Sequence, residues 1–179
     1  FPSMPLKFWN DKNDVKFKKA YFNRYKNTWH HGDYAERKNN DGFIIHGRSD
    51  TTLNPGGVRL GTAEIYSEVE KFKEIKEALV VGQSWDNDIR VILFLVMSNR
   101  YSLNDTLLSR IKTQIKTNAS PRHVPKKVIV VKDIPRTKSG KIVELAVKST
   151  IEGNIVKNKE ALANPEVLIQ YKNLKELNH

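Results

Sequence analysis

The 179-residue chain contains no cysteine. Disulfide scaffolds, thiolate metal sites and cysteine nucleophiles are therefore excluded, and the composition fits a protein of the cytosol. Long apolar runs are also missing, because none approaches the roughly 20 residues that a membrane-spanning helix needs. The longest run, Val91 to Met97, is typical of a buried strand. The start of the chain lacks the basic segment followed by an apolar segment that marks a secretory signal, so none is expected.

Negative charge is under-represented, and the formal net charge is +11. Such a balance favours nucleic acid, an anionic membrane or phosphorylated small molecules as partners. The lysines are spread over the whole chain and do not form one block, so a generally lysine-rich composition explains the charge equally well. The charge alone does not choose between these partners.

The first 48 residues are predicted to form strands and turns without a helix. One hairpin is expected from Leu6–Asn10 and Val15–Lys18, because the connection between them consists of turn formers. A second hairpin is expected from His31–Glu36 and Phe43–Gly47, with Asp-Gly in the turn. Two hairpins bury too little apolar surface to fold alone, so this region is expected to need a larger domain.

From Asp50 onward the pattern predicts a self-contained α+β unit, a small three-stranded sheet with packed helices and a short β-hairpin at 52–60. Helices are expected after the N-cap residue Thr62, from Asn104 to about Asn118 with Leu108, Ile111 and Ile115 inward, and over 144–151. Strands are expected over 78–82, 90–97 and 127–131. A last helix is expected to begin at Asn164-Pro165-Glu166.

The stretch from Trp29 to Asp33 holds the first candidate site. An aspartate beside a glycine at a strand bend can present its carboxylate to a vicinal diol, although an ordinary turn aspartate has the same appearance. The pair His30-His31 does not favour a metal site, because adjacent strand residues point to opposite faces and no third ligand is evident.

Two further segments combine glycines with cations. Residues 47–65 are rich in glycine and arginine, which indicates close backbone approach and anion binding; a glycine-rich hairpin between domains is the alternative. Residues 134–141 carry three cations, two hydroxyls and a glycine, which suits a phosphate, whereas a solvated basic loop is the alternative. This is not a Walker loop, because Gly140-Lys141 is followed by Ile142 and not by Ser or Thr.

Taken together, the order and spacing of these three segments resemble the adenylate-forming family of acyl-CoA synthetases, luciferases and peptide-synthetase adenylation domains. The resemblance covers essentially the whole chain. A closer resemblance is to acyl-CoA synthetases that activate acetoacetate. It rests on Phe8–Asp11, Ala20–Phe22, Trp29 with His31–Asp33, Thr52–Pro55 with Gly57–Arg59, Val143-Glu144, Val147-Lys148 and Asn164–Glu166. Ile142 departs from the pattern, since a second lysine is common there.

The resemblance implies a two-step ligation in which ATP, accompanied by Mg²⁺, forms an acyl-adenylate, and coenzyme A then displaces AMP. It also implies that residues 1–49 end a large adenylation domain and that 50–179 form a mobile lid. The implied roles are Asp33 for the ribose hydroxyls, Arg48 near the ribose or its phosphate, Asp50 as hinge, Arg59 for phosphate or one lid orientation, Gly57 beside the pantetheine passage, Lys116 for the 3′-phosphate of coenzyme A, and Lys141 as the catalytic lysine.

The phosphate loop and acyl pocket of the family lie upstream of the matching segments. The chain is therefore expected to be a C-terminal fragment that requires its N-terminal domain and does not turn over ATP alone. Synthetases for acetate or propionate remain alternatives, because no acyl-pocket residue is present to decide. A basic nucleic-acid-binding module is a remote alternative, since no known nucleic-acid motif occurs.

Overall fold

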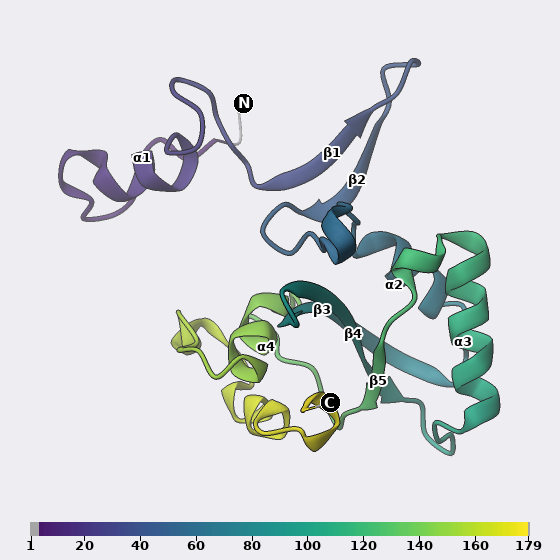
Figure 1. Ribbon diagram of the computed structural model, residues 1–179. Helices are drawn as coiled ribbons and strands as arrows, with labels where there is room; N and C mark the ends of the chain where they lie inside the picture. The colour runs from purple at the N-terminus through teal and green to yellow at the C-terminus, as the bar shows by residue number, and fades with distance from the viewer. Residues whose placement is uncertain (1–3, 179) are drawn as a thin grey trace. The chain divides into compact units, whose positions relative to one another are not determined.

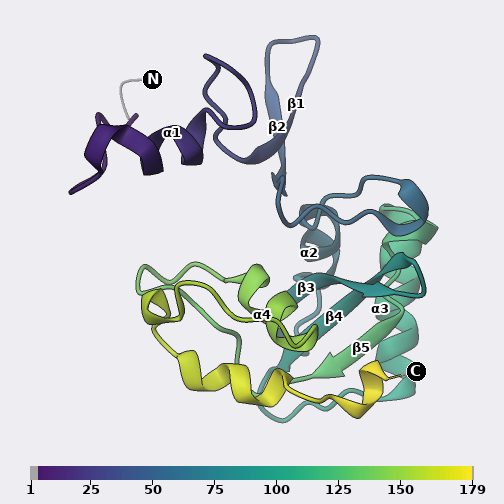
Figure 2. The ribbon, with the colours of Figure 1, turned by 60° about the vertical axis from the view of Figure 1, so that its left-hand side comes forward.

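The computed structural model describes residues 4–178, which fold as two compact units divided between Asp33 and Tyr34. Figure 1 shows the ribbon coloured along the chain, and Figure 2 shows the same ribbon turned by 60°. Among the described residues, no helix is both long enough and apolar enough to span a bilayer.

The first unit contains a helix where a hairpin was predicted, and the prediction of strands over 6–18 is wrong. A 3₁₀ turn at Lys12–Asp14 leads into α1, Val15–Tyr21. The Asp11 carboxylate accepts hydrogen bonds from the backbone N–H groups of Lys16 and Phe17, at 2.9 and 2.8 Å, so this residue caps a helix and does not make a strand turn. Phe17 and Tyr21 then share one face of the helix and pack with other aromatic rings. The rings of Tyr21 and Trp29 are stacked, with 3.8 Å between their centres.

The second predicted hairpin is confirmed as β1, Asp33–Arg37, and β2, Phe43–Arg48. Its turn is closed by a hydrogen bond of 2.8 Å from the N–H of Lys38 to the carbonyl oxygen of Gly42. Three consecutive apolar side chains of β2, Phe43, Ile44 and Ile45, are exposed.

The predicted three-stranded sheet is confirmed; its first two strands are longer than predicted, and the third ends one residue earlier than predicted. Its order is β3 (Ile75–Trp85), β4 (Asp88–Met97), β5 (Lys127–Val130); β3 and β4 are antiparallel, and β4 and β5 are parallel. Successive side chains enter opposite cores, as strand geometry requires: Val80 and Leu93 face one core, and Leu79 and Phe94 face the other. The central strand β4 is thus covered on both faces.

Helices and the C-terminal tail cover the two faces. The first core includes side chains of α2, Ala63–Val69, and α3, Asp105–Asn118; the second includes those of α4, Glu144–Ile151, and of the tail. Figures 1 and 2 show α3 on one side of the sheet and α4 with the yellow tail on the other. The predicted helix over 144–151 is confirmed.

Two helix predictions need adjustment. Asn104 caps α3 by accepting a hydrogen bond of 2.8 Å from the N–H of Leu107, but the buried face contains Leu107 in place of Leu108. Spacing by four residues along the chain, from 107 to 111 to 115, accounts for this face. The helix predicted at Asn164 begins at Pro165 as expected, yet it is a 3₁₀ helix, Pro165–Tyr171.

Candidate functional site

Lys141 lies near the end of a tight loop, residues 134–143, that we call the lysine loop. Arg136 and Ile142 form an antiparallel bridge across its base. Inside, the N–H of Thr137 donates to the carbonyl oxygen of Lys141 at 2.8 Å, and the N–H of Lys141 donates to Oγ1 of Thr137 at 3.1 Å. Gly140 has φ +83°, a conformation that suits glycine. The backbone of Lys141 is therefore held in place while its side chain is exposed.

The three cations of the lysine loop are not equivalent. Arg136 donates from Nη1 to the carbonyl oxygen of Gly140 at 3.2 Å and forms an ion pair with Glu77 on β3. Its guanidinium therefore ties the loop to the sheet. Lys138 and Lys141 have exposed side chains. A solvated basic loop would lack this internal bracing.

The predicted hinge is a compact turn after β2. Nε of Arg48 lies 3.4 Å from Oδ1 of Asp50. The carbonyl oxygen of Arg48 accepts hydrogen bonds from the hydroxyl groups of Thr51 and Thr52, at 3.2 and 3.0 Å. The structure thus brings two predicted site residues, Arg48 and Asp50, into direct contact.

Glu144, which the sequence reasoning gave no role, joins the lysine loop to the hinge. It is the first residue of α4, three positions after Lys141, and it accepts a hydrogen bond of 2.5 Å from the hydroxyl of Tyr66 on α2. Burial raises the pKa of Glu144, opposed by hydrogen bonds from Tyr66, Thr51 and Thr62. Two sequence signals could have identified it: its spacing from the lysine and its place in the Val143-Glu144 match.

His46 connects the β1–β2 hairpin to α2. Its Nδ1 lies 2.7 Å from Oε1 of Glu64, and its Nε2 lies 3.1 Å from Oε2 of Glu36. The hydrogen bond with Glu64 raises the pKa of His46, burial opposes this, and Glu36 adds to the rise. Glu64 lies after Asp50 in the chain and His46 before it, so this cluster spans the predicted hinge.

Lys116 lines a basic groove of about 1060 Å³. The groove also contains Lys112, one helical turn away on the same face of α3, and Gly56. Further cations come from the segment after α3: Arg122, Lys126 and Lys127. Sequence reasoning chose only Lys116, although the spacing of four residues from Lys112 could have identified the pair. The arrangement suits an anion with several charges.

Gly57 lies in the 3₁₀ turn Pro55–Gly57 beside this groove, with φ +76° and no atom within 4 Å of the position of a Cβ. The turn is anchored because the N–H of Gly56 donates to both carboxylate oxygens of Asp88, at 2.9 and 3.0 Å. Arg59 is exposed, and its guanidinium carbon lies 5.8 Å from the ring centre of Tyr34.

Asp33 ends the first unit, whereas the other predicted site residues belong to the second. It follows Gly32, whose φ is +92°, and its Oδ2 lies 3.9 Å from Nε2 of His31. The Nδ1 atom of His31 accepts a hydrogen bond of 3.2 Å from the indole of Trp29. Over residues 4–178, no group of three or more His, Cys, Asp or Glu side chains is placed to hold a metal ion.

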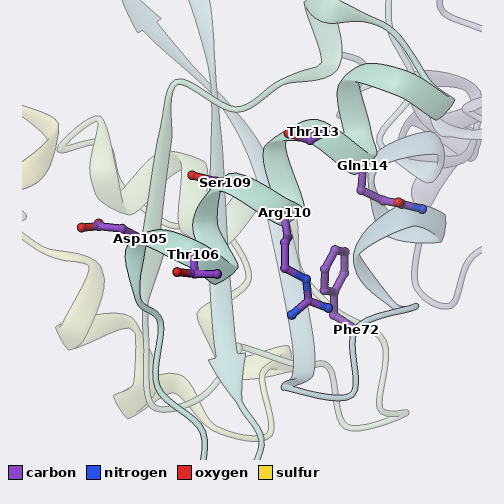
Figure 3. A pocket seen from close by; sticks show the side chains of 7 residues that line it. All are labelled: Phe72, Asp105, Thr106, Ser109, Arg110, Thr113 and Gln114. Atoms are coloured by element: carbon purple, nitrogen blue, oxygen red, sulfur yellow. The ribbon is translucent and has the colours of Figure 1, made fainter.

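A second hollow, of about 710 Å³, lies along α3 and contains none of the predicted site residues. Figure 3 shows its polar side chains spread along the helix without converging on a point. Its cation, Arg110, forms an ion pair with Glu74 at 3.0 Å and lies 5.3 Å from the ring centre of Phe72. Nothing in this hollow points to a ligand.

Comparison with known proteins identifies the family. Residues 64–141 match the AMP-binding enzyme C-terminal domain. Acetoacetyl-coenzyme A synthetase of Rhizobium meliloti (strain 1021) is 58% identical over 177 residues, which are 99% of this chain and 27% of that protein. Over nearly its whole length, the chain is thus similar to part of an acyl-CoA synthetase. Acetoacetyl-CoA synthetase of Xenopus tropicalis is 48% identical, over 98% of this chain and 26% of its own length.

Solved acyl-CoA synthetases share the fold. The acetoacetyl-CoA synthetase from Streptomyces lividans is 40% identical, with a TM-score of 0.88, over 96% of this chain and 26% of that chain. The ATP-bound MatB from Rhodopseudomonas palustris is only 20% identical, with a TM-score of 0.67, so it supports the fold alone. The chain spans about a quarter of the length of the curated relatives it matches. The predicted family and fold class are thereby confirmed.

Proposed function

We propose that this chain supplies the mobile C-terminal domain of an AMP-forming ligase that joins acetoacetate to coenzyme A at the expense of ATP. The observation that carries the proposal is the lysine loop, which holds the backbone of Lys141 rigidly and leaves its ammonium group exposed. The rest of the enzyme is an N-terminal adenylation domain, consistent with the quarter of the relatives that this chain covers.

In the first half-reaction, a carboxylate oxygen of the acid attacks the α-phosphate of ATP, and pyrophosphate leaves. Negative charge gathers on both reacting groups as they approach each other. A fixed cation at that point lowers the barrier because its position needs no reorganisation during the step. Lys141 is placed in this role. ATP brings Mg²⁺ with it, and no residue of this chain is assigned as its ligand.

The remaining site residues bind or orient the nucleotide. Asp33 holds the ribose hydroxyls, and Arg48 lies near the same ribose or its phosphate. Asp50 is the hinge between residues 1–49 and 50–179, about which the lid changes orientation between the half-reactions. Arg59 contacts phosphate or stabilises one of the two orientations.

In the second half-reaction, the thiol of coenzyme A displaces AMP from the adenylate. Gly57 lines the passage for pantetheine, which is supported by the absence of any atom within 4 Å of the position that a Cβ would take there. The basic groove binds the 3′-phosphate of coenzyme A through Lys116, with Lys112 beside it. Two cations one helical turn apart suit a phosphate dianion better than one does.

The deciding experiment assays Lys141→Ala in the complete enzyme, separately for the two half-reactions. Pyrophosphate release with acetoacetate and ATP is expected to fall by at least about 100-fold, and conversion of pre-formed adenylate to thioester is expected to persist. Lys138→Ala is the matched control, because the Lys138 side chain is also exposed on the same loop. Unchanged adenylation by Lys141→Ala would refute the proposal.

The choice of acetoacetate rests on the names of the relatives and not on a pocket within this chain. Specificity constants of the complete enzyme for acetoacetate, acetate and propionate test it directly. Acetoacetate is expected to be preferred over both. A preference for acetate or propionate would reassign the substrate but leave the role of Lys141 standing.

A further inference from the structure

The tail beyond the matched family domain runs alongside the lysine loop. Leu162 forms an antiparallel bridge with Thr137. The N–H of Ala163 donates to the carbonyl oxygen of Arg136 at 2.8 Å, and the N–H of Lys138 donates to that of Ala161 at 3.2 Å. A short stretch of tail thus acts as an extra strand on the loop, although it begins twenty residues after Lys141.

Asn164, the next residue, has an unusual side-chain arrangement for its position. It occupies the N-cap position of the 3₁₀ helix Pro165–Tyr171, where an asparagine ordinarily accepts a hydrogen bond from the first helical amides. It makes no such bond. The side chain points away from its own helix, so capping does not explain why an amide is needed here.

The Asn164 amide instead bonds to the base of the lysine loop. Its Oδ1 accepts a hydrogen bond of 2.9 Å from the N–H of Arg136. Its Nδ2 donates to Oδ2 of Asp133 at 2.9 Å and to the carbonyl oxygen of Ile134 at 3.0 Å. Both amide hydrogens and the amide oxygen are therefore used, and all three bonds are part-buried.

These bonds lie close to the catalytic group along the loop. Arg136 pairs with Ile142, the neighbour of Lys141, and its guanidinium holds the carbonyl oxygen of Gly140, the other neighbour. A shift of the Arg136 backbone therefore displaces both residues that flank the lysine. Misplacement of a reacting group by about 1 Å can lower a rate by about 100-fold.

Other contacts hold the tail itself in place. Leu162, Leu168 and Tyr171 are buried in the second core. Gln170 accepts a hydrogen bond of 2.7 Å from the N–H of Lys132 and donates one of 2.8 Å to the carbonyl oxygen of Asp133. Loss of the Asn164 amide should therefore leave the tail docked and loosen only the lysine loop.

We propose that Asn164 is a positioning residue for Lys141, acting from the tail to fix the lysine loop for adenylation. The inference rests on the proposed function of Lys141 and adds a residue outside the segment that matches the family domain. This positioning role requires the side-chain amide of Asn164 to act as both acceptor and donor of hydrogen bonds.

The test uses Asn164→Asp in the complete enzyme, because this variant keeps the size of the side chain. A carboxylate can still accept from the N–H of Arg136, but it cannot donate to Ile134 and it repels Asp133. The kcat of pyrophosphate release is expected to fall about 10- to 100-fold with the KM for ATP nearly unchanged, and conversion of pre-formed adenylate to thioester is expected to stay at the parent rate.

Gln170→Ala is the matched control. This substitution also removes two hydrogen bonds between the same tail and residues 132–133, but neither of these bonds involves residues 134–141. Hydrogen exchange of the 179-residue chain supplies the structural readout. Asn164→Asp should speed exchange at the amides of Thr137, Gly140 and Lys141 by at least about tenfold, with no change in β3 and β4; Gln170→Ala should not.

The outcomes separate the two proposals. Parent-like adenylation by Asn164→Asp, in an enzyme that Lys141→Ala inactivates, overturns the positioning role alone. Equal losses in Asn164→Asp and Gln170→Ala also overturn it, because the tail would then act only through general stability. Full activity of Lys141→Ala removes the proposed function itself.

Discussion

The lysine loop and the hinge region, residues 46–64, hold their shapes by different kinds of interaction. The loop relies largely on backbone hydrogen bonds, the Asn164 side chain and the ion pair between Arg136 and Glu77, and it contains no histidine. Around the hinge, ionisable side chains make the contacts: His46 with Glu36 and Glu64, and Arg48 with Asp50.

This difference suits the two proposed tasks. A residue that stabilises a transition state needs a fixed position, and the backbone hydrogen bonds of the loop provide one. A region that changes orientation needs contacts that can be broken and remade, and partly exposed ion pairs contribute little to stability. We therefore expect the hinge region to respond more strongly to pH than the loop does.

The largest effect on stability is expected from Gly61→Ala. A Cβ at this buried position would lie 2.4 Å from the carbonyl oxygen of His46, so β2 and the start of α2 would have to separate. The free energy of unfolding in urea should fall by about 3 kcal/mol. Gly42→Ala is the control, since its Cβ would meet only the flexible side chain of Asn40, at 3.1 Å. Equal stability of the two variants would show that the hinge region is not closely packed.

A smaller effect is expected from Tyr66→Phe, which removes the hydroxyl between the hinge region and α4. The N–H of Val80, which donates to this hydroxyl at 2.9 Å, and the Glu144 carboxylate each lose a partner. Stability should fall by about 2 kcal/mol.

The pH dependence of Tyr66→Phe distinguishes this mechanism from lost packing. Burial already raises the pKa of Glu144, and loss of a donor raises it further. A raised carboxyl pKa gives a stability contribution that is lost as pH rises, so the deficit should be larger at about pH 7 than at about pH 4. A loss of stability that does not change with pH would contradict a mechanism that acts through Glu144. Tyr101→Phe, whose side chain is partly exposed, serves as control.

The smallest effect is expected from His46→Gln, measured as thermal or urea stability across pH. Because the folded pKa of His46 is raised above 6.5, its contribution is fully present below that value and is lost as pH rises through the folded pKa. The free energy of unfolding of the parent chain should exceed that of the variant by about 0.5–1 kcal/mol at about pH 6. This difference should vanish by about pH 9. Exchange at the lysine-loop amides should not distinguish the two chains, apart from the intrinsic dependence of exchange on pH.

Local signals in the sequence predicted much of the second unit. Continuous apolar runs indicated the strands of the sheet, Asn104 indicated the start of α3, and Asp-Gly indicated the β1–β2 turn. The same local reasoning failed over residues 6–18, where turn formers suggested a hairpin. There Asp11 caps a helix, and the ring contacts of Phe17 and Tyr21 outweigh strand propensity.

The candidate site divides in a similar way. Motif order was enough to single out Asp50 and Lys141, because each lies in a short contiguous pattern. Glu77 and Tyr66 carried no such pattern, and the pattern at Asn164 indicated only a helix start, since each of the three contacts the site from a distant part of the chain. Lys112 lies between these cases, for its helical spacing from Lys116 was visible but had no meaning until β4 and the segment after α3 formed the groove.

The resemblance to the family, the sheet and the identity of the loop that bears Lys141 can be inferred from the sequence alone, because those features depend on residues close together in the chain. Which of the loop's cations are exposed, and what holds the loop, depends on the tertiary fold. Arg136 is bound by Glu77 on β3 and by the loop's own carbonyl oxygen, and the Arg136 backbone is bound by Asn164 in the tail. Polar groups taken out of water must find partners wherever the fold places them, and that placement is not a local property.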